Sequence, residues 1–542
     1  MEHLKRLAMN LLSEPWLPVR RRDGRSDWIA PTQLTDPDLV AFDACRPDFN
    51  GALAQFAIGL LQTCTPAADV SAWRRWLQSP PDEVALTEWF SPHQIAFEFD
   101  GDGPRFMQDL ELRSSDGEPL SVANLLIDAP GENAIRDNSD HFVKRGRVRA
   151  LCSHCAALAL FTLQTNAPSG GAGHRTGLRG GGPLTTLLVA TGRPGQPASL
   201  WQTLWLNVRA QSTFMSTPPE SGMDAPFRTF PWLAPQGALQ KGEGNTTPLQ
   251  VHPAHVFWAM PRRIRLELGS PESGDCDLCG HPSRALISCY VTRNHGLNYE
   301  GAWRHPLSPY YAGKEGLLPL HPQPGGLGYR HWLAWVLGVH NDRKHVEPAL
   351  VVSQFQQRER QSGLAVRLWA FGYDMKNMKP RCWYESTVPL YELGDCSVSE
   401  HKALREEVGS WLSGAEFAVG VLRTAVKNAW FGADPRGDLG FVDAAFWNRT
   451  EAAFYQRLRE RIHALRNGAE ITDPLASAES WRLSLRQAAL AIFDRDLVGS
   501  GAIERQHPAR ASEARRYLQR SLDGPKLRAA LCLPEPVRAK AN

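Results

Sequence analysis

Residues 150–186 read ALCSHCAALALFTLQTNAPSGGAGHRTGLRGGGPLTT, and this stretch indicates how the first part of the chain is built. It opens with the pair Cys152 and Cys155, continues through an apolar run typical of a buried helix, and ends in two glycine clusters. Glycine lets backbone N–H groups approach a ligand closely. The neighbouring Arg175 and Arg179 carry paired donors of the kind that bind phosphate. The stretch therefore predicts a rigid segment, anchored by the cysteine pair and the helix, whose glycine-rich backbone contacts a polyanion.

A second Cys-x-x-Cys pair, Cys276 and Cys279, stands far downstream in the sequence CDLCG. Each pair has the spacing of a zinc knuckle, and two pairs can complete a tetrahedral thiolate site. Such a site would be structural, because four thiolates leave no coordination position open to water. We therefore expect a structural zinc ion held by Cys152, Cys155, Cys276 and Cys279. The alternative is that one of the two pairs is simply buried.

The composition of the chain restricts its class. A chain of 542 residues is too long for one ordinary core, so we expect at least two domains. A net charge of +3 confines any nucleic-acid surface to a local patch. The 18 tryptophans suggest extensive interfaces in addition to a core. The sequence shows no signal-peptide core and no apolar run of membrane-spanning length, so we expect a cytoplasmic protein with reduced cysteines.

Apolar residues recur at spacings of three and four from about Val398 onward, which predicts amphipathic helices. Four such stripes cover residues 404–429, 454–465, 481–493 and 517–522. Their simplest arrangement is a four-helix bundle. The predicted fold class is therefore α+β. A large mixed α/β N-terminal domain with the zinc knuckle site covers residues 1–395, and an all-α four-helix bundle covers residues 396–542.

The outer faces of the predicted helices are rich in arginine. These side chains are either simply solvated or available for contact with phosphate groups. They are Arg457, Arg459, Arg461, Arg482, Arg486, Arg515, Arg516 and Arg520.

A long polar segment, DAPGENAIRDNSDHFVKRGRVRA at residues 128–150, has no regular pattern and ends in a basic cluster. Long loops in compact proteins are often functional. Phe142 stands among its polar residues, next to Lys144 and Arg145. Either this ring anchors the loop on the body of the protein, or it contacts a nucleic acid whose phosphates the basic residues hold.

The motifs of common enzyme classes are missing from the sequence. The glycine clusters do not follow the Gly-x-x-x-x-Gly-Lys-Ser/Thr pattern of a phosphate-binding loop. The chain has no Gly-x-Ser-x-Gly, no His-Glu-x-x-His and no paired-carboxylate motif. Asp140-His141 lacks the further ligands of a metal phosphohydrolase. We therefore expect a protein that is not an enzyme.

Six segments together resemble the large subunit, the CasA family, of the type I-E CRISPR surveillance complex called Cascade. They are MNLLSEPWLPVR, ALCSHCAALALF, NAPSGGAGHRTGLRGGGPLTT, CDLCG, WRHPLSPYY and GYDMKNMKPRCWYES, in that order along the chain. The resemblance implies a non-catalytic, RNA-guided antiviral defence subunit that works with the other Cascade subunits and crRNA. It further implies recognition of the protospacer-adjacent motif (PAM) in the minor groove of double-stranded target DNA. The resemblance also implies that the subunit helps to unwind the duplex for crRNA pairing. It implies as well that the subunit recruits a separate helicase–nuclease.

The resemblance also assigns roles by position. The family's glycine loop falls on Ser169 to Gly173, with DNA-binding residues Gly170, Gly171, Ala172 and Gly173. The duplex-splitting wedge falls on Lys376, Asn377 and Met378. The loop that contacts crRNA and neighbouring subunits falls on residues 133–149, with Phe142, Lys144 and Arg145. The four cysteines fall on the zinc ligands.

This sequence departs from the family pattern at three positions. Asn294 stands where the family has a minor-groove lysine, with Arg293 or His295 as alternatives. Asn377 stands where one branch has a wedge glutamine, and Ala172 replaces a loop glycine. The resemblance therefore leaves the preferred PAM open. Two other functions stay open. One is a scaffold that holds partners without reading a motif. The other is a metal-dependent nuclease component, which would need clustered acidic ligands that the sequence does not display.

Overall fold

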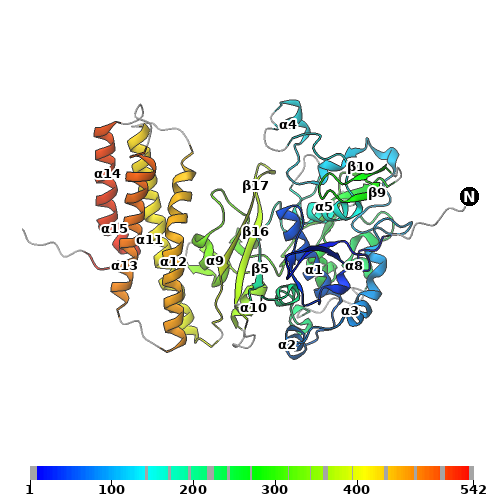
Figure 1. Cartoon of the computed structure of the whole chain (residues 1–542), viewed down its shortest axis with the longest axis horizontal. Coiled ribbons are helices and arrows are strands. Elements are labelled where there is room, and N and C mark those ends of the chain that lie inside the picture. Colours follow the sequence, from blue (N-terminus) through cyan, green and yellow to red (C-terminus); the bar gives the residue numbers. More distant parts are fainter. Residues whose placement is uncertain are drawn as a thin grey trace, which may run out of the picture. The chain divides into compact units, whose positions relative to one another are not determined.

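Figure 1 shows the computed structural model of the chain. It describes residues 9–138, 140, 144–168, 173–192, 197–215, 225–240, 244–268, 272–314, 316–341, 344–357, 364–393, 395–431, 438–468, 473–500 and 507–535. The chain divides into two compact units. The first unit comprises Met1–Pro322, Ala349–Val352 and Ser362–Thr387. The second comprises Gln323–Pro348, Ser353–Gln361 and Val388–Asn542.

The core of the first unit forms around helix α1 (Pro47–Cys64). Pro47 occupies the first helical position, where a missing N–H is harmless. Phe56 of α1 is surrounded by five aromatic rings at centroid distances of 5.0 to 6.0 Å, those of Trp16, Phe97, Phe106, Phe161 and Trp258. Phe161 lies on helix α5 (Ser153–Asn166), which packs against α1. The predicted buried helix after the first cysteine pair is thus α5.

Three small antiparallel arrangements surround these helices. The strands β1 (Leu17–Arg21), β2 (Ser26–Ile29) and β3 (Leu39–Phe42) form a sheet in the order β2-β1-β3. The strands β4 (Leu120–Ser121), β7 (Arg263–Leu266) and β10 (Cys289–Arg293) form another in the order β4-β10-β7. The hairpin of β8 (Glu272–Asp275) and β9 (Pro282–Leu286) carries the second cysteine pair between its strands.

A longer sheet contains β5 (Thr185–Ala190), β16 (Val366–Lys376) and β17 (Lys379–Pro389) in the order β17-β16-β5. β16 pairs antiparallel with β5, with Leu368 opposite Leu188. β5 is the strand that directly follows the second glycine cluster. The sheet therefore joins the glycine segment to the β16–β17 hairpin, which lies about 180 residues further along the chain.

Short helices and strands complete the described part of the first unit. They include α2 (Val70–Gln78), α3 (Glu83–Phe90), α4 (Glu132–Arg136), α6 (Leu200–Leu206), α7 (Gln211–Phe214), α8 (Pro226–Thr229), β6 (Asn245–Thr246), β11 (Asn298–Tyr299), β12 (Tyr310–Gly313) and β13 (Gly316–Pro319). Helix α10 (Leu350–Gln357) belongs partly to each unit.

The second unit is mainly helical. Helices α11 (Val398–Phe431), α12 (Gly440–Arg466), α13 (Pro474–Ala491) and α14 (Pro508–Asp523) each carry one of the four predicted apolar stripes. They run side by side in Figure 1, and α11 packs against the other three and against α15 (Pro525–Ala530). The unit also contains α9 (Trp332–Val336), β14 (Val339–Asn341) and β15 (Lys344–Glu347). No helix in the described ranges is both long enough and apolar enough to cross a membrane.

The expected basic outer face of these helices is neutralised at four of its eight arginines. Arg482 is buried, not solvated, and contacts Glu479 and Asp523. Arg457 lies over the rings of Trp411 and Trp481, 5.6 and 5.7 Å from their centroids. Three further arginines pair with carboxylates: Arg461 with Glu407, Arg486 with Asp523, and Arg515 with Asp494. The sequence pattern missed this because a charged position on an amphipathic helix looks the same whether or not an acidic partner faces it.

Many tryptophans belong to the core. Eight of them are among the largest fully buried side chains: Trp16, Trp201, Trp205, Trp258, Trp332, Trp335, Trp411 and Trp481. Several indole N–H groups donate to backbone carbonyls, such as Trp205 to the carbonyl of Trp73 at 2.8 Å. These residues stabilise the interior, and the expectation that a tryptophan surplus serves interfaces does not apply to them.

Candidate functional site

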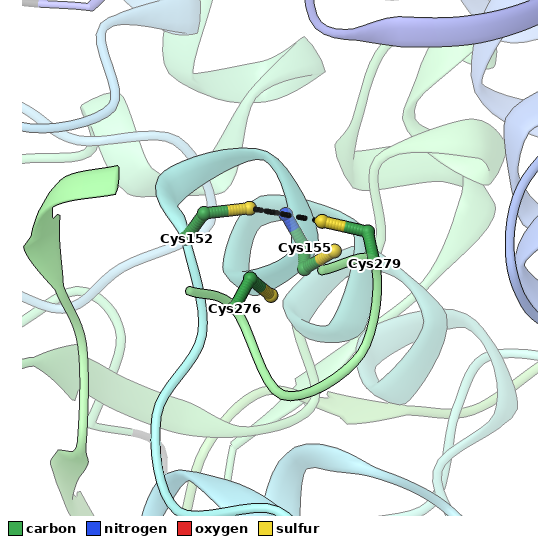
Figure 2. A group of neighbouring side chains, drawn as sticks. All are labelled: Cys152, Cys155, Cys276 and Cys279. Atoms are coloured by element: carbon green, nitrogen blue, oxygen red, sulfur yellow. Dashed lines mark hydrogen bonds between the residues drawn. The ribbon is translucent and has the colours of Figure 1, made fainter. Parts of the chain in front are cut away.

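The four cysteines of the two Cys-x-x-Cys pairs meet in space, as Figure 2 shows. Cys152 and Cys155 lie at the start of α5, and Cys276 and Cys279 lie between β8 and β9. Their sulfur atoms all lie within 4.8 Å of one another, and only Cys279 is not fully buried. The Sγ atoms of Cys152 and Cys279 are 3.8 Å apart. Segments more than 100 residues apart thus form one cluster that could hold a metal ion.

Backbone hydrogen bonds hold the two cysteine segments in place. The N–H of Cys155 donates to the sulfur of Cys152 at 3.5 Å, and that of His281 donates to the sulfur of Cys279 at 3.4 Å. Gly280 adopts a φ of +69°, a left-handed turn that closes with its N–H on the carbonyl of Cys276 at 2.8 Å.

Asp277 fixes the second segment against the first. Its carboxylate accepts hydrogen bonds from the N–H groups of Arg149 and Ala150, at 2.6 and 2.9 Å. Its own N–H donates to the carbonyl of Ala150 at 3.1 Å. The loop between β8 and β9 is therefore attached directly to the residues that precede Cys152.

The chemistry of the four donors fits a tetrahedral metal ion. Contacts with the sulfurs of Cys152, Cys276 and Cys279, together with burial, raise the pKa of the Cys155 thiol. Four thiolates can therefore share this space only when a cation neutralises them. Sulfurs about 2.3 Å from a central zinc would be about 3.8 Å apart at tetrahedral corners. The separation between Cys152 and Cys279 agrees with that value.

Three rings next to the cluster were not identified from the sequence. The centroid of Trp28 lies 5.0 Å from that of His154 and 5.9 Å from that of His281. Burial, together with the nearby His281, lowers the pKa of His154 to about 4, which keeps its ring neutral. His154 and His281 stand inside or just after the cysteine pairs, so their spacing was a usable signal. Trp28 comes from β2, and nothing in the sequence connects it to the site.

The glycine segment is described only from Gly173 onward. Gly170, Gly171 and Ala172 lie outside the described residues. Gly173 has a φ of +82°, and its carbonyl accepts from the N–H of His295 at 2.9 Å. A Cβ atom at Gly173 would lie 2.7 Å from that of Asn294. The structure therefore places Gly173 directly against Asn294, whose side chain is exposed, as are those of Arg293 and His295.

The second glycine cluster contacts β16 just beyond its last pair with β5, where the free end of the β16–β17 hairpin begins; this point is called the hairpin base. Gly182 has a φ of +63°, and its N–H donates to the carbonyl of Asn166 at the end of α5. A Cβ atom at Gly182 would lie 2.7 Å from Cβ of Tyr373 and 2.8 Å from its carbonyl oxygen. The hairpin base can approach this closely only because position 182 has no side chain.

The tip of this hairpin holds the three predicted wedge residues. β16 ends at Lys376 and β17 begins at Lys379, so Asn377 and Met378 form a two-residue turn. Their φ values are +50° and +62°, as a type I′ turn requires. Asparagine tolerates this conformation, whereas methionine is unusual there. The Met378 side chain is 53% exposed, so the turn presents an apolar group to solvent in a strained conformation.

The polar loop before the first cysteine pair is organised by an internal ion pair. Arg145 donates to both carboxylate oxygens of Asp140, at 2.9 and 3.1 Å, and to the side chain of Asn138 at 2.9 Å. These hydrogen bonds hold the pKa of Asp140 well below its usual range. Lys144 is exposed. Phe142 lies outside the described residues.

Two arginines near the glycine segment have positions that the sequence did not predict. Arg179 does not present donors at the surface, because it is 3% exposed and binds side chains of the interior. Arg262, which no motif indicated, donates to the carbonyl of Pro168 and lowers the pKa of His174, whose burial is the larger cause. Among the described residues Arg262 has no carboxylate partner. It therefore supplies positive charge at the point where the glycine segment begins.

The chain is similar to known proteins over most of its length. A family model described as CRISPR-associated protein Cse1 matches residues 10–492. A crystal structure of CasA from Thermus thermophilus is 19% identical, with a TM-score of 0.66 over 95% of this chain and 99% of that one. Cse1 from Acidimicrobium ferrooxidans is also 19% identical, with a TM-score of 0.62 over 97% and 99%.

A third similar structure is described as a CRISPR RNA-guided surveillance complex. The matching chain in it is 16% identical, with a TM-score of 0.66 over 95% of this chain and 99% of that one. At these identities the three structures establish a shared fold.

Proposed function

The chain belongs to the CRISPR-associated Cse1 family, and from this premise we propose that it is the large, non-catalytic subunit of a type I-E Cascade complex. In this role it recognises the PAM of double-stranded target DNA through the minor groove and helps to open the duplex. It works with crRNA and the other subunits in the cytoplasm and recruits the helicase–nuclease. The domain of residues 1–395 reads the DNA through its first-unit segments, since residues 323–348, 353–361 and 388–395 belong to the second unit. Residues 396–542 form the four-helix bundle.

The observation that carries the proposal is the contact of Gly173 with Asn294. The half-buried backbone of Gly173 and the exposed amide side chain of Asn294 lie together on segments that are about 120 residues apart. The minor groove offers mainly a distinction between A·T and G·C pairs. Backbone and short polar groups suit such a degenerate code, since they follow groove shape. This agrees with the division in RNA-guided systems, where guide pairing reads the sequence and the protein reads a short motif.

The hairpin tip suits strand separation. Proteins that bend or open DNA often insert an apolar side chain between base steps. Met378 is such a group, and Lys376 stands two residues before it, at the end of β16, to hold a phosphate. Separating a base-pair step costs about 1.4 kcal/mol on average. A side chain that stacks on the exposed base offsets this cost at the first step, where crRNA pairing must begin.

We infer that the metal of the cysteine cluster is zinc. Cys152, Cys155, Cys276 and Cys279 would hold it. The ion would supply structural cross-linking only, because all four positions are taken by protein sulfur. The exposed loop with Lys144 and Arg145, together with Phe142, is proposed to contact crRNA and neighbouring subunits. Arg145 would act by shaping this loop through Asp140 as well as by its charge.

The proposal is tested with the guide-loaded complex and duplex targets of varied PAM. Asn294→Ala should narrow or abolish the difference in affinity between preferred and non-preferred motifs. Lys376→Ala should weaken binding to a closed duplex more than to a target opened beforehand at the first base pairs. Lys344→Ala, at the exposed lysine that begins the β15 strand, is the matched control and should change neither result. Equal affinity for all motifs with every variant would favour the scaffold function instead.

A further inference from the structure

A small cavity lies in the first unit beneath the glycine segment. It has a volume of about 20 Å³ and is lined by residues from α1, α5 and the segments around Ala259 and His305. A cavity needs roughly 10–15 Å³ to hold one water molecule. The space therefore accommodates a single particle of that size. It excludes sulfate, phosphate and any organic ligand.

The buried guanidinium of Arg179 lines this cavity. Its Nη1 donates to the hydroxyls of Thr185 and Ser308, both at 3.0 Å, and its Nη2 donates to the side-chain oxygen of Gln55. All three partners are neutral, and no carboxylate of the described chain contacts this group. Arginine has five N–H donors, so two are left without a partner among the described residues. Burial lowers the pKa of Arg179 only to about 10, so it stays charged at neutral pH.

His305 adds a second donor to the cavity wall. The ring is 2% exposed, and its Nδ1 accepts from the N–H of Leu307 at 3.2 Å. Burial and the charge of Arg179 lower the pKa of His305, so the ring is neutral. A neutral imidazole whose Nδ1 accepts carries its proton on Nε2. That N–H has no partner among the residues that the structure describes.

The two glutamine side chains of the wall are occupied. The oxygen of Gln55 accepts from Arg179, and its amide nitrogen donates to the carbonyl of Gly51 at 3.2 Å. The amide of Gln164 donates to the carbonyl of Arg262 and accepts from the N–H of that residue. The wall also carries the hydroxyl of Thr165, which can donate or accept. The cavity therefore offers donors and one positive charge, and the charge of Arg179 would repel a cation.

We propose that this cavity binds one small monovalent anion, chloride under ordinary salt conditions, between Arg179 and His305. A water molecule would satisfy the donors but would leave a buried charge without a counter-charge, which is costly. A halide ion would accept from the donors and neutralise the buried charge. Because Arg179 connects the glycine segment to β5 and α1, the bound anion stabilises the support behind that segment. This inference does not depend on the proposed role in DNA recognition.

The test is thermal unfolding of the full chain while chloride replaces gluconate at constant ionic strength. The unfolding temperature of the first unit should rise by about 2 °C and then saturate, as expected for a ligand that binds only the folded state. Bromide should act like chloride, and sulfate should not. Ala259→Val, which adds side-chain volume at the cavity wall, should remove the response. Ala488→Val, at an equally buried alanine of the second unit, should keep it.

Diffraction from crystals grown in bromide provides a second measurement that needs no variant. An anomalous peak within hydrogen-bond distance of Arg179 and His305 supports the proposal. Two results would overturn it. One is an unfolding temperature that is the same in chloride and gluconate. The other is a cavity that contains only water in bromide crystals. A saturable chloride response that survives in Ala259→Val would show that the ion binds elsewhere and would also refute it.

Discussion

The cysteine cluster and the β16–β17 hairpin tip lie in the same unit but are built in opposite ways. The cluster is buried, and each of its loops is fixed by hydrogen bonds from the other segment or from its own backbone. The tip is exposed and carries a methionine at a positive φ. The comparison indicates a division within the first unit. The buried cysteine cluster is rigid, whereas the strained and exposed side chain lies at the hairpin tip, where a ligand would be contacted.

The largest effect is expected from removing a cysteine of the cluster. Cys276→Ser should reduce bound metal to well below one equivalent and destabilise the first unit by at least about 3 kcal/mol, because metal binding contributes directly to folding. Metal analysis and thermal unfolding measure both effects. Cys289→Ser, at a half-buried cysteine outside the cluster, is the control and should retain the metal. If Cys276→Ser kept a full equivalent of metal, the four-cysteine site would be wrong.

The next largest effect is expected at the contact between the glycine segment and the hairpin base. Gly182→Ala combines an unfavourable φ with a clash against Tyr373, so it should cost about 2–4 kcal/mol of unfolding free energy. Gly24→Ala has a similar φ but open space around it, so it should cost only about 1–2 kcal/mol. Denaturant unfolding measures both. Equal costs for the two variants would mean that the hairpin base does not depend on this close approach.

A smaller effect, an increase in the free energy of unfolding, is expected at the hairpin tip. Met378→Gly removes the strain of a side chain at positive φ, so it should stabilise the chain by about 0.5–1 kcal/mol. The same change should weaken binding to a closed duplex by the assembled complex, because the apolar side chain is lost. Met378→Leu keeps both strain and side chain and should resemble the natural protein in both measurements. A glycine variant that binds duplex normally would remove Met378 from the wedge.

The smallest change in stability is expected in the polar loop. Arg145→Ala breaks a local ion pair within one loop, between the half-exposed Arg145 and Asp140, and should leave the unfolding temperature of the isolated chain within about 1 °C of the natural value. Assembly of the chain with the crRNA-bound subunits should weaken, since the loop loses its internal connection. Asp140→Asn, which keeps Arg145 but removes the ion pair, separates loop shape from charge. Unchanged assembly with both variants would contradict a role for this loop.

The features predicted well from the sequence are those set by local spacing. The helical stripes of the second unit lie on α11 to α14, and the four cysteines form one cluster. The family is confirmed by the match over residues 10–492. The helical stripes and the cysteine pairs depend on residues that are a few positions apart. Two Cys-x-x-Cys pairs also have few alternatives to a shared metal site.

The features that failed depend on partners distant in the sequence. Arg179 was expected at the surface because glycines and a basic neighbour surround it. Its neutral partners, Gln55 and Ser308, come from positions more than 100 residues away on either side. Arg482 was misplaced for the same reason, since its partner Asp523 lies at the end of another helix, α14. The glycine loop remains a prediction at Gly170, Gly171 and Ala172.

The central claim is that this chain confers PAM preference on a guide-loaded complex. The most direct measurement is binding of the complex, assembled with and without this chain, to a library of duplex targets with a randomised motif beside the protospacer. The account predicts a clear enrichment of a small set of motifs with the chain and none without it. It also predicts that Asn294→Ala flattens the enrichment. Identical motif profiles with and without the chain would contradict the account and leave a scaffold role.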